Sequence, residues 1–175
     1  MAILPELETA RLSLRRLQFA DAPFLVGLLN QPSFLANIGD RGVRNEDDAH
    51  RYLREGPLAM YAKHGFGLWL VSRRDDGASI GMCGLLKRET LPDVDLGYAL
   101  LPEYWGQGYA LEAAQATLRH AVDRFRLARV IAIVSQGNAA SIRVLEKLGM
   151  KFERMVSMRP DEPDVRLYGR SLGPA

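Results

Sequence analysis

The chain has 175 residues, of which 47% are hydrophobic and 25% charged, as expected for a single globular domain with a substantial core. Its 23 basic and 21 acidic side chains leave a formal charge of +2, which argues against a nucleic-acid-binding protein with a strongly basic face. The single cysteine, Cys83, excludes an intramolecular disulfide, and no apolar run approaches the roughly 20 residues that span a bilayer. We therefore expect a cytoplasmic protein with no nucleic-acid or membrane partner.

The first part of the chain is expected to form one strand followed by two helices. Alternating apolar residues from Arg11 predict the strand. Asp21 stands where a helix N-cap is favoured, and we expect that helix to run to about Asn30. Asn45 caps a second predicted helical region through about Lys63, and the segment between the two helices is expected to be a loop.

Strands and helices alternate in the rest of the chain. Asp76-Gly77 is a strong hairpin signal and joins two β-rich runs. A fourth strand, a helix, a buried strand and an Asn138-capped helix ended by Gly149 follow, and two strands complete the order. The fourth strand covers residues 94–101, and the helix after it runs to about residue 125. The buried strand covers 129–135, the next helix 138–149, and the last two strands 151–158 and 165–172. The order, with seven strands and four helices, predicts one α/β domain.

The segment "PEYWGQGYALEA", residues 102–113, places two glycines directly before a predicted helix. The N–H groups at a helix N-terminus have no partner within the helix, and the helix dipole adds positive charge there. Gly106 and Gly108 would let a phosphate group approach these N–H groups without obstruction by Cβ atoms. The alternative is that both are ordinary turn glycines.

Two other phosphate-binding motifs do not fit this segment. A dinucleotide-binding fingerprint requires a third glycine where the chain has Leu111, and it requires an acidic residue about 20 positions later, where none occurs. A P-loop requires Gly-Lys followed by Ser or Thr, which the sequence lacks.

The segments "LGYALLPEYWGQGYALEA" and "NAASIRVLEKLGM" together resemble the acyl-CoA site of the GNAT N-acetyltransferase superfamily. The similarity is greatest to its RimJ/RimL-like branch, which acetylates protein N-termini among other amines, and "ETARLSLRRL" resembles the opening strand of that branch. The resemblance implies one N-acetyltransferase domain over residues 1–175. Its fold would be a mixed, mostly antiparallel sheet of about seven strands, flanked by four helices and splayed between strands 4 and 5.

The same resemblance implies acetyl-CoA as co-substrate and assigns residues to it. The pyrophosphate would be bound by backbone amides, and the pantetheine arm by a strand end and a helix start. These residues are Trp105, Gly106, Gln107, Gly108, Tyr109 and Ala110 for the pyrophosphate, and Ala99, Leu100, Leu101, Asn138 and Ser141 for the arm. Apart from the resemblance, Arg143 and Lys147 lie one helical turn apart, and Lys147 is the candidate contact for the 3′-phosphate. The chain departs from the family at Trp105, where Arg or Gln is usual, and at Leu145, where many relatives have a tyrosine.

Acetyl transfer to an amine needs a base, a donor to the carbonyl oxygen and a hydroxyl near the leaving sulfur. Asp95 is the candidate base because it interrupts an apolar run, although it could equally be an exposed strand carboxylate. Backbone N–H groups near Leu100 are the candidate donors. Ser141 is the candidate hydroxyl, and Tyr98 and Tyr109 are weaker substitutes for it.

The amine acceptor is expected to bind against the first half of the chain. The candidate lining residues are Phe34, Asn37, Ile38, Trp69 and Tyr98, of which Trp69 is equally well explained as core. An α-amine with a pKa near 8 is about 10% neutral at pH 7, against about 0.04% for lysine, so a weak base such as Asp95 suits an α-amine better. The protein N-terminus is therefore the expected acceptor.

Other functions remain open at this point. The acceptor could be a small amine such as a polyamine, an amino acid or an aminoglycoside. Because the usual tyrosine is replaced, the chain could also be a non-catalytic acyl-CoA sensor. The three histidines show no metal-ligand spacing, so no metal is expected, and the protein is expected to be a monomer or homodimer.

Overall fold

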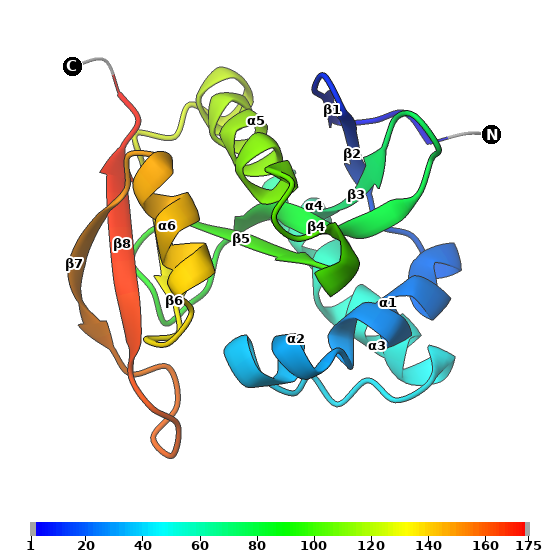
Figure 1. Ribbon diagram of the computed structural model, residues 1–175, viewed down its shortest axis with the longest axis horizontal. Coiled ribbons are helices and arrows are strands. Elements are labelled where there is room, and N and C mark those ends of the chain that lie inside the picture. The colour runs from blue at the N-terminus through cyan, green and yellow to red at the C-terminus, as the bar shows by residue number, and fades with distance from the viewer. Residues whose placement is uncertain (1–2, 174–175) are drawn as a thin grey trace.

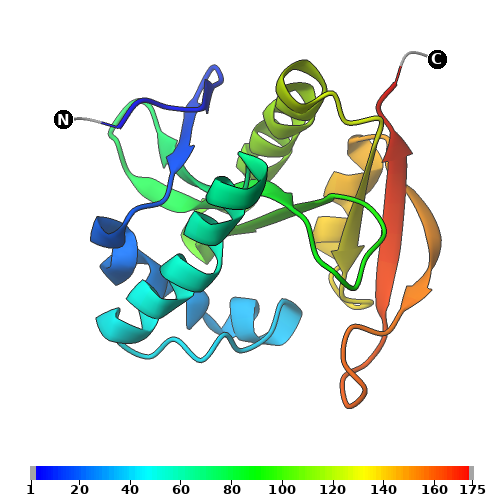
Figure 2. The same ribbon diagram turned by 180° about the vertical axis from the view of Figure 1, so that it is seen from behind.

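The computed structural model describes residues 3–173, which form an open sheet with helices on both faces (Figures 1 and 2). The strand order is β1-β2-β3-β4-β5-β6-β8-β7, and every neighbouring pair is antiparallel except β5 and β6, which are parallel. The strands are β1 Leu7–Glu8, β2 Leu12–Arg16, β3 Leu68–Arg73, β4 Ser79–Leu86, β5 Asp95–Leu100, β6 Arg129–Val134, β7 Lys151–Val156 and β8 Val165–Ser171. The helices are α1 Ala22–Leu29, α2 Pro32–Asn37, α3 Glu46–Glu55, α4 Pro57–His64, α5 Tyr109–Phe125 and α6 Ala139–Lys147.

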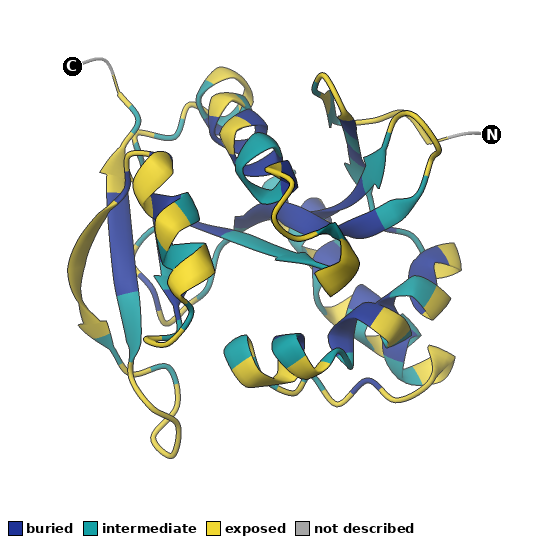
Figure 3. Cartoon of the chain, in the orientation of Figure 1, coloured by how far each residue is buried: buried dark blue, intermediate teal, exposed yellow. Residues whose placement is uncertain are grey.

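Two apolar clusters hold the helices against the sheet. The larger one packs α5 and α6 on one face through residues such as Leu85, Leu118 and Leu145. The smaller one packs α1 and α3 against the other face through Leu25 and Leu70, among others. The central strands are accordingly buried, whereas the outer faces of α5 and α6 are exposed (Figure 3).

The predicted splay is present between β5 and β6. These strands pair in register only at Asp95 and Ile131, where the Ile131 N–H donates to the Val94 carbonyl at 3.0 Å. Beyond that point the two strands diverge, and α6 lies over the gap between them (Figure 1). One edge of β5 is therefore left without a partner strand along most of its length.

The mixed, mostly antiparallel sheet agrees with the prediction, but the predicted counts of strands and helices were too low. Residues 7–8 add the short strand β1. The segment expected to be a loop contains α2, which begins with Pro32 at its first position, where proline is tolerated. The predicted helical region over 45–63 is divided into α3 and α4, because Pro57 lacks an N–H and disfavours helical geometry at Gly56.

Several local signals are confirmed at the residues that carry them. Asn45 and Asn138 accept from backbone N–H groups in the first turns of α3 and α6, at 2.8 and 3.2 Å. Gly77 turns the β3–β4 hairpin with φ +72°, and Gly149 ends α6 with φ +78°. Asp21 precedes α1 as expected, but its carboxylate pairs with an arginine of β2 instead of capping the helix. Within residues 3–173, each helix is too short or too polar to cross a membrane.

Candidate functional site

The chain turns sharply between the end of β5 and the start of α5, through a 3-10 turn and residues 105–108. We call residues 105–110 the elbow. Gly106 and Gly108 have φ of +72° and +81°, in the left-handed region that side chains rarely adopt. A Cβ atom on Gly106 would meet no heavy atom within 4 Å, so backbone conformation rather than crowding favours glycine there.

The elbow presents a run of free backbone donors. In the part of the chain that the structure describes, no acceptor bonds the N–H of Gly106, Gln107 or Gly108, and the first turn of α5 adds those of Tyr109 and Ala110. The elbow is exposed at residues 105–108, so an anion from solvent can reach these donors. A helix N-terminus with exposed N–H groups suits a phosphate or diphosphate.

Trp105 differs from the prediction that its amide joins this run. Its N–H donates to the Pro102 carbonyl at 3.1 Å, so the free donors begin one residue later. The Trp105 indole is 51% exposed, and its Nε1 donates to the Leu100 carbonyl at 3.0 Å. The side chain therefore lies against the unpaired edge of β5.

The turn between β1 and β2 holds the elbow from outside. Arg11 Nη1 donates to the Gln107 carbonyl at 2.9 Å, and Arg11 Nε pairs with Glu112 Oε2 at 2.7 Å. The guanidinium also lies 4.4 Å from the centre of the Tyr109 ring, and Thr9 Oγ1 donates to Glu112 Oε1 at 2.6 Å. These contacts join segments about a hundred residues apart in the sequence.

Arg11 also sets the direction of a donor. The Gln107 carbonyl and the Gly108 N–H belong to one planar peptide and point in opposite directions. Because Arg11 binds that carbonyl, the Gly108 N–H is turned toward the side away from Arg11. Sequence reasoning missed this contact, since Arg11 was assigned only to a strand.

The unpaired edge of β5 carries alternate backbone groups. The Leu101 N–H donates to Ile80 on the β4 side, whereas the Val94 carbonyl accepts from β6. Because strand backbone groups alternate in direction, the N–H groups of Tyr98 and Leu100 face the gap. The prediction that Ala99 and Leu101 also offer backbone groups there was wrong, because theirs face β4.

Two hydroxyl groups, one from β5 and one from α6, lie within hydrogen-bonding distance across the gap between β5 and β6. Tyr98 Oη and Ser141 Oγ lie 2.6 Å apart, and Asn138 Oδ1 accepts from the Ser141 N–H. Burial raises the pKa of Tyr98 to about 12, so its phenol stays protonated at neutral pH. Leu145 is buried in the core and has no polar side-chain group to add to this contact. Tyr98 thus lies on the α6 side of β5 and not with the other predicted acceptor residues.

Asp95 lies where β5 and β6 part. Its side chain is 1% exposed, so the alternative of an exposed strand carboxylate was wrong. Burial raises the pKa of Asp95 to about 6, although Arg88 Nε lies 3.3 Å from Asp95 Oδ2 and opposes this shift. Among the described residues, Asp95 Oδ1 has no hydrogen-bond partner. Because side chains alternate along a strand, Asp95 and Tyr98 lie on opposite faces of the sheet.

The predicted acceptor residues are only partly brought together. Phe34 is buried in the smaller cluster, and the Asn37 carbonyl accepts from Ser135 Oγ at 2.6 Å, which ties α2 to the end of β6. Ile38 is exposed. Trp69 was wrongly predicted to line the acceptor pocket, because it is fully buried in the larger cluster and packs edge-on against His120.

Lys147 lies away from the elbow. It lines a cavity of about 660 Å³ together with residues 115–123 of α5 and Arg170. Because α5 and α6 run in the same direction (Figure 1), the C-terminal end of α6 lies beside the second half of α5. This placement does not support the predicted contact of Lys147 with a nucleotide 3′-phosphate.

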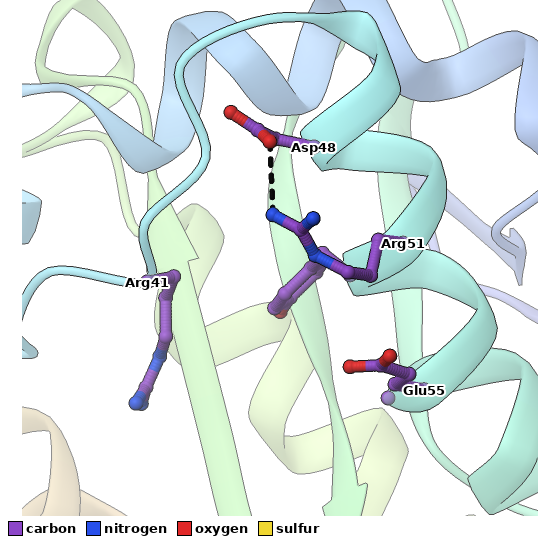
Figure 4. Close-up of a pocket in the computed structure, with 6 residues that line it drawn as sticks. Arg41, Asp48, Arg51 and Glu55 are labelled. Carbon is purple, nitrogen blue, oxygen red and sulfur yellow. Dashed lines mark hydrogen bonds and ion pairs between the residues drawn. The ribbon is translucent and has the colours of Figure 1, made fainter.

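A second cavity, of about 260 Å³, opens on the face of the sheet that carries α3 (Figure 4). It is lined by Arg41, Asp48, Arg51, Tyr52, Glu55 and Gly56. Asp48 Oδ1 and Arg51 Nη2 form an ion pair at 2.9 Å, one helical turn apart on α3. None of these residues was a predicted site residue, because only their charges stand out in the sequence and charged residues usually lie on a solvated surface.

Comparisons with known proteins agree with this geometry. The family model described as an acetyltransferase (GNAT) domain matches residues 11–151. Two similar proteins are the uncharacterized N-acetyltransferase YjdG of Bacillus subtilis, 31% identical over 82% of this chain and 88% of its own, and the FsC-acetyl coenzyme A-N(2)-transacetylase of Aspergillus fumigatus, 28% identical over 91% and 70%. The crystal structure of an acetyltransferase from Agrobacterium tumefaciens is 26% identical and superposes with a TM-score of 0.79 over 97% of this chain and 96% of its own.

The substitution Gly108→Glu is expected to abolish binding of coenzyme A. A side chain at φ +81° strains the backbone, and a carboxylate there repels the diphosphate. Gly77→Glu is the matched control, because it introduces the same side chain at φ +72° in a distant hairpin with open space around it. Calorimetric titration with coenzyme A measures both variants, and unchanged affinity in Gly108→Glu contradicts this placement.

Arg11→Gln is expected to weaken coenzyme A binding about tenfold, because the charge-assisted hydrogen bonds that fix the elbow are lost. Acetyl-pantetheine lacks the diphosphate, so its turnover should fall far less. Arg154→Gln, at an exposed position on β7, controls for the change of charge. Equal losses with both acyl donors would instead indicate a general structural defect.

Proposed function

This chain belongs to the GNAT acetyltransferase family, whose model spans residues 11–151, and we propose that it transfers the acetyl group of acetyl-CoA to the N-terminal α-amine of a protein or peptide. Members of this family are N-acetyltransferases that take the acetyl group from acetyl-CoA. The acceptor, the catalytic residues and the RimJ/RimL-like branch are parts of the proposal.

The observation that carries the proposal is the continuity between the elbow and the unpaired edge of β5. The free N–H groups from Gly106 onward suit a diphosphate, and the Tyr98 and Leu100 backbone faces the adjoining gap. A linear molecule with a diphosphate at one end and amides along its arm can bind the elbow and the edge of β5 at the same time. Coenzyme A has this form, and its thioester would then lie near the gap.

Backbone donors on β5 would polarise the thioester carbonyl. The N–H groups of Tyr98 and Leu100 face the gap without a partner strand, so they need no rearrangement to donate to the carbonyl oxygen. One such preorganised donor is typically worth roughly 3–4 kcal/mol of transition-state stabilisation.

Asp95 is the proposed general base. Its carboxylate is ionised above a pKa of about 6 and can then take a proton from an α-amine, directly or through one water. Its position on the face that carries α3 places it on the side opposite the elbow and Ser141. The base would thus approach the amine from the acceptor side.

Tyr98 and Ser141 would stabilise the leaving sulfur. Their hydroxyls form a pair at 2.6 Å on the α6 side of the gap. Because burial raises the pKa of Tyr98 to about 12, complete proton transfer to a thiolate is unfavourable. The pair would instead donate a hydrogen bond to the developing thiolate. This pair offers a substitute for the tyrosine that many relatives have at the position of Leu145.

A free α-amine suits the weak base better than lysine does, as the neutral fractions at pH 7 indicate. The Aspergillus relative is an N(2)-transacetylase by name, which agrees with an amine acceptor. The alternatives are a small-molecule amine acceptor and a non-catalytic acyl-CoA sensor. Release of thiol from acetyl-CoA with a panel of amines and N-terminal peptides separates them, because a sensor binds coenzyme A without turnover. Cytoplasmic location and a monomeric or dimeric state are part of the same proposal.

Asp95→Asn should lower turnover about 100-fold or more without weakening coenzyme A binding, because general-base catalysis contributes that much. In the unsubstituted protein, kcat/KM should rise with pH through a midpoint near 6 as Asp95 loses its proton, and the variant should lack this rise. Asp93→Asn is the control, since that carboxylate pairs with Arg129. A variant that matches the parent rate across the pH range would exclude Asp95 as the base.

A further inference from the structure

Arg41 carries a positive charge that no carboxylate of the described chain pairs with. It lies in the loop before α3, is half-buried, and makes no hydrogen bond or ion pair with any residue in the range 3–173. Burial lowers the pKa of Arg41, and the nearby Arg88 and Arg159 lower it further, whereas Tyr52 and Glu162 oppose this shift. A partly buried charge without a partner costs stability, and an anionic ligand that paired with it would offset this cost.

The two other arginines near Arg41 each lie close to a carboxylate. Arg88 Nε lies 3.3 Å from Asp95 Oδ2, and Arg159 Nη1 lies 3.2 Å from Glu162 Oε1. Among these three arginines of the described chain, Arg41 is thus the one without a carboxylate partner, and Arg88 links its surroundings to the proposed base Asp95.

The orientation of Arg41 separates it from the carboxylates of the cavity. Its guanidinium points away from the Asp48–Arg51 ion pair, and Glu55 lies across the cavity on α3 (Figure 4). Tyr52 lines the same cavity and lies near both Arg41 and Arg88, which connects the cavity with the surroundings of Asp95.

On the basis of the acetyl transfer proposed above, we infer that the acceptor is an anionic amine, whose negatively charged group binds Arg41 while its amine lies near Asp95. An arginine without an ion-pair partner favours the neutral, reactive form of a nearby amine and repels polycations. Polyamines and aminoglycosides are therefore poor acceptors. An α-amine followed by an acidic side chain and a free acidic amino acid both carry the required group.

Three C-terminally amidated peptides test the inference: Ala-Asp-Gly, Ala-Asn-Gly and Ala-Lys-Gly. With acetyl-CoA, the Asp peptide should show a kcat/KM about tenfold above the Asn peptide, and the Lys peptide should react least. Arg41→Gln should remove the preference for Asp, whereas Arg51→Gln, in the same cavity but paired with Asp48, should retain it. Free glutamate compared with glutamine distinguishes a small acceptor from a peptide.

The outcomes separate this inference from the proposed function. Turnover that ignores the charge of the acceptor, or favours Lys, overturns the inference and leaves acetyl transfer intact. If no acceptor turns over, acetyl transfer to these amines is overturned. Calorimetric binding of the peptides to the protein loaded with coenzyme A then decides: preference for Asp that Arg41→Gln abolishes supports the anionic site, and equal binding excludes it.

Discussion

The parting of β5 from β6 is the constraint on which the site depends. Buried backbone groups in proteins are almost always paired, yet these parallel strands share a single register pair at Asp95 and Ile131. The sheet stays intact because β5 keeps its full antiparallel pairing with β4, and α6 lies over the gap and closes it with the contact between Ser141 and Tyr98. The open edge of β5 and the elbow that follows it thus offer two neighbouring sets of free backbone donors, separated by the bonded N–H groups of Leu101 and Trp105.

The alternation of side chains along β5 separates two kinds of chemistry. Odd-numbered positions bring Asp95 to the face that carries α3, where the arginines lie, and even-numbered positions bring Tyr98 to the face that carries α6. Reagents that approach from opposite faces can therefore meet only in the gap. A carboxylate and a phenol three residues apart in sequence are kept from each other by the sheet itself, so neither interferes with the protonation of the other.

The sequence predicted those parts of the fold and site in which the local backbone conformation or a helix cap requires a particular residue type. The turns at Gly77 and at Gly106 and Gly108 agree with the sequence, because positive φ angles are rarely open to other residues. The phosphate-binding role of Gly106 and Gly108 stays a prediction. The helix cap at Asn138 was predicted correctly, because its hydrogen bond goes to the first turn of the same helix. What was missed depends on contacts across the fold. Arg11 donates to a carbonyl 96 residues away, and Arg41 stands out only because it has no partner among residues 3–173. Trp69 was misassigned because an apolar aromatic residue fits a core and a pocket equally well in sequence.

The different surroundings of the two tryptophans give the protein an internal optical reporter. Trp69 is fully buried in the core. The Trp105 indole is half-exposed and donates a hydrogen bond to the Leu100 carbonyl at the open edge of β5. Water-borne quenchers such as iodide therefore reach one indole and not the other. Any molecule that binds along the open edge of β5 must shield the Trp105 indole from solvent or displace it. The tryptophan fluorescence of the protein therefore reports binding at this edge without an added label.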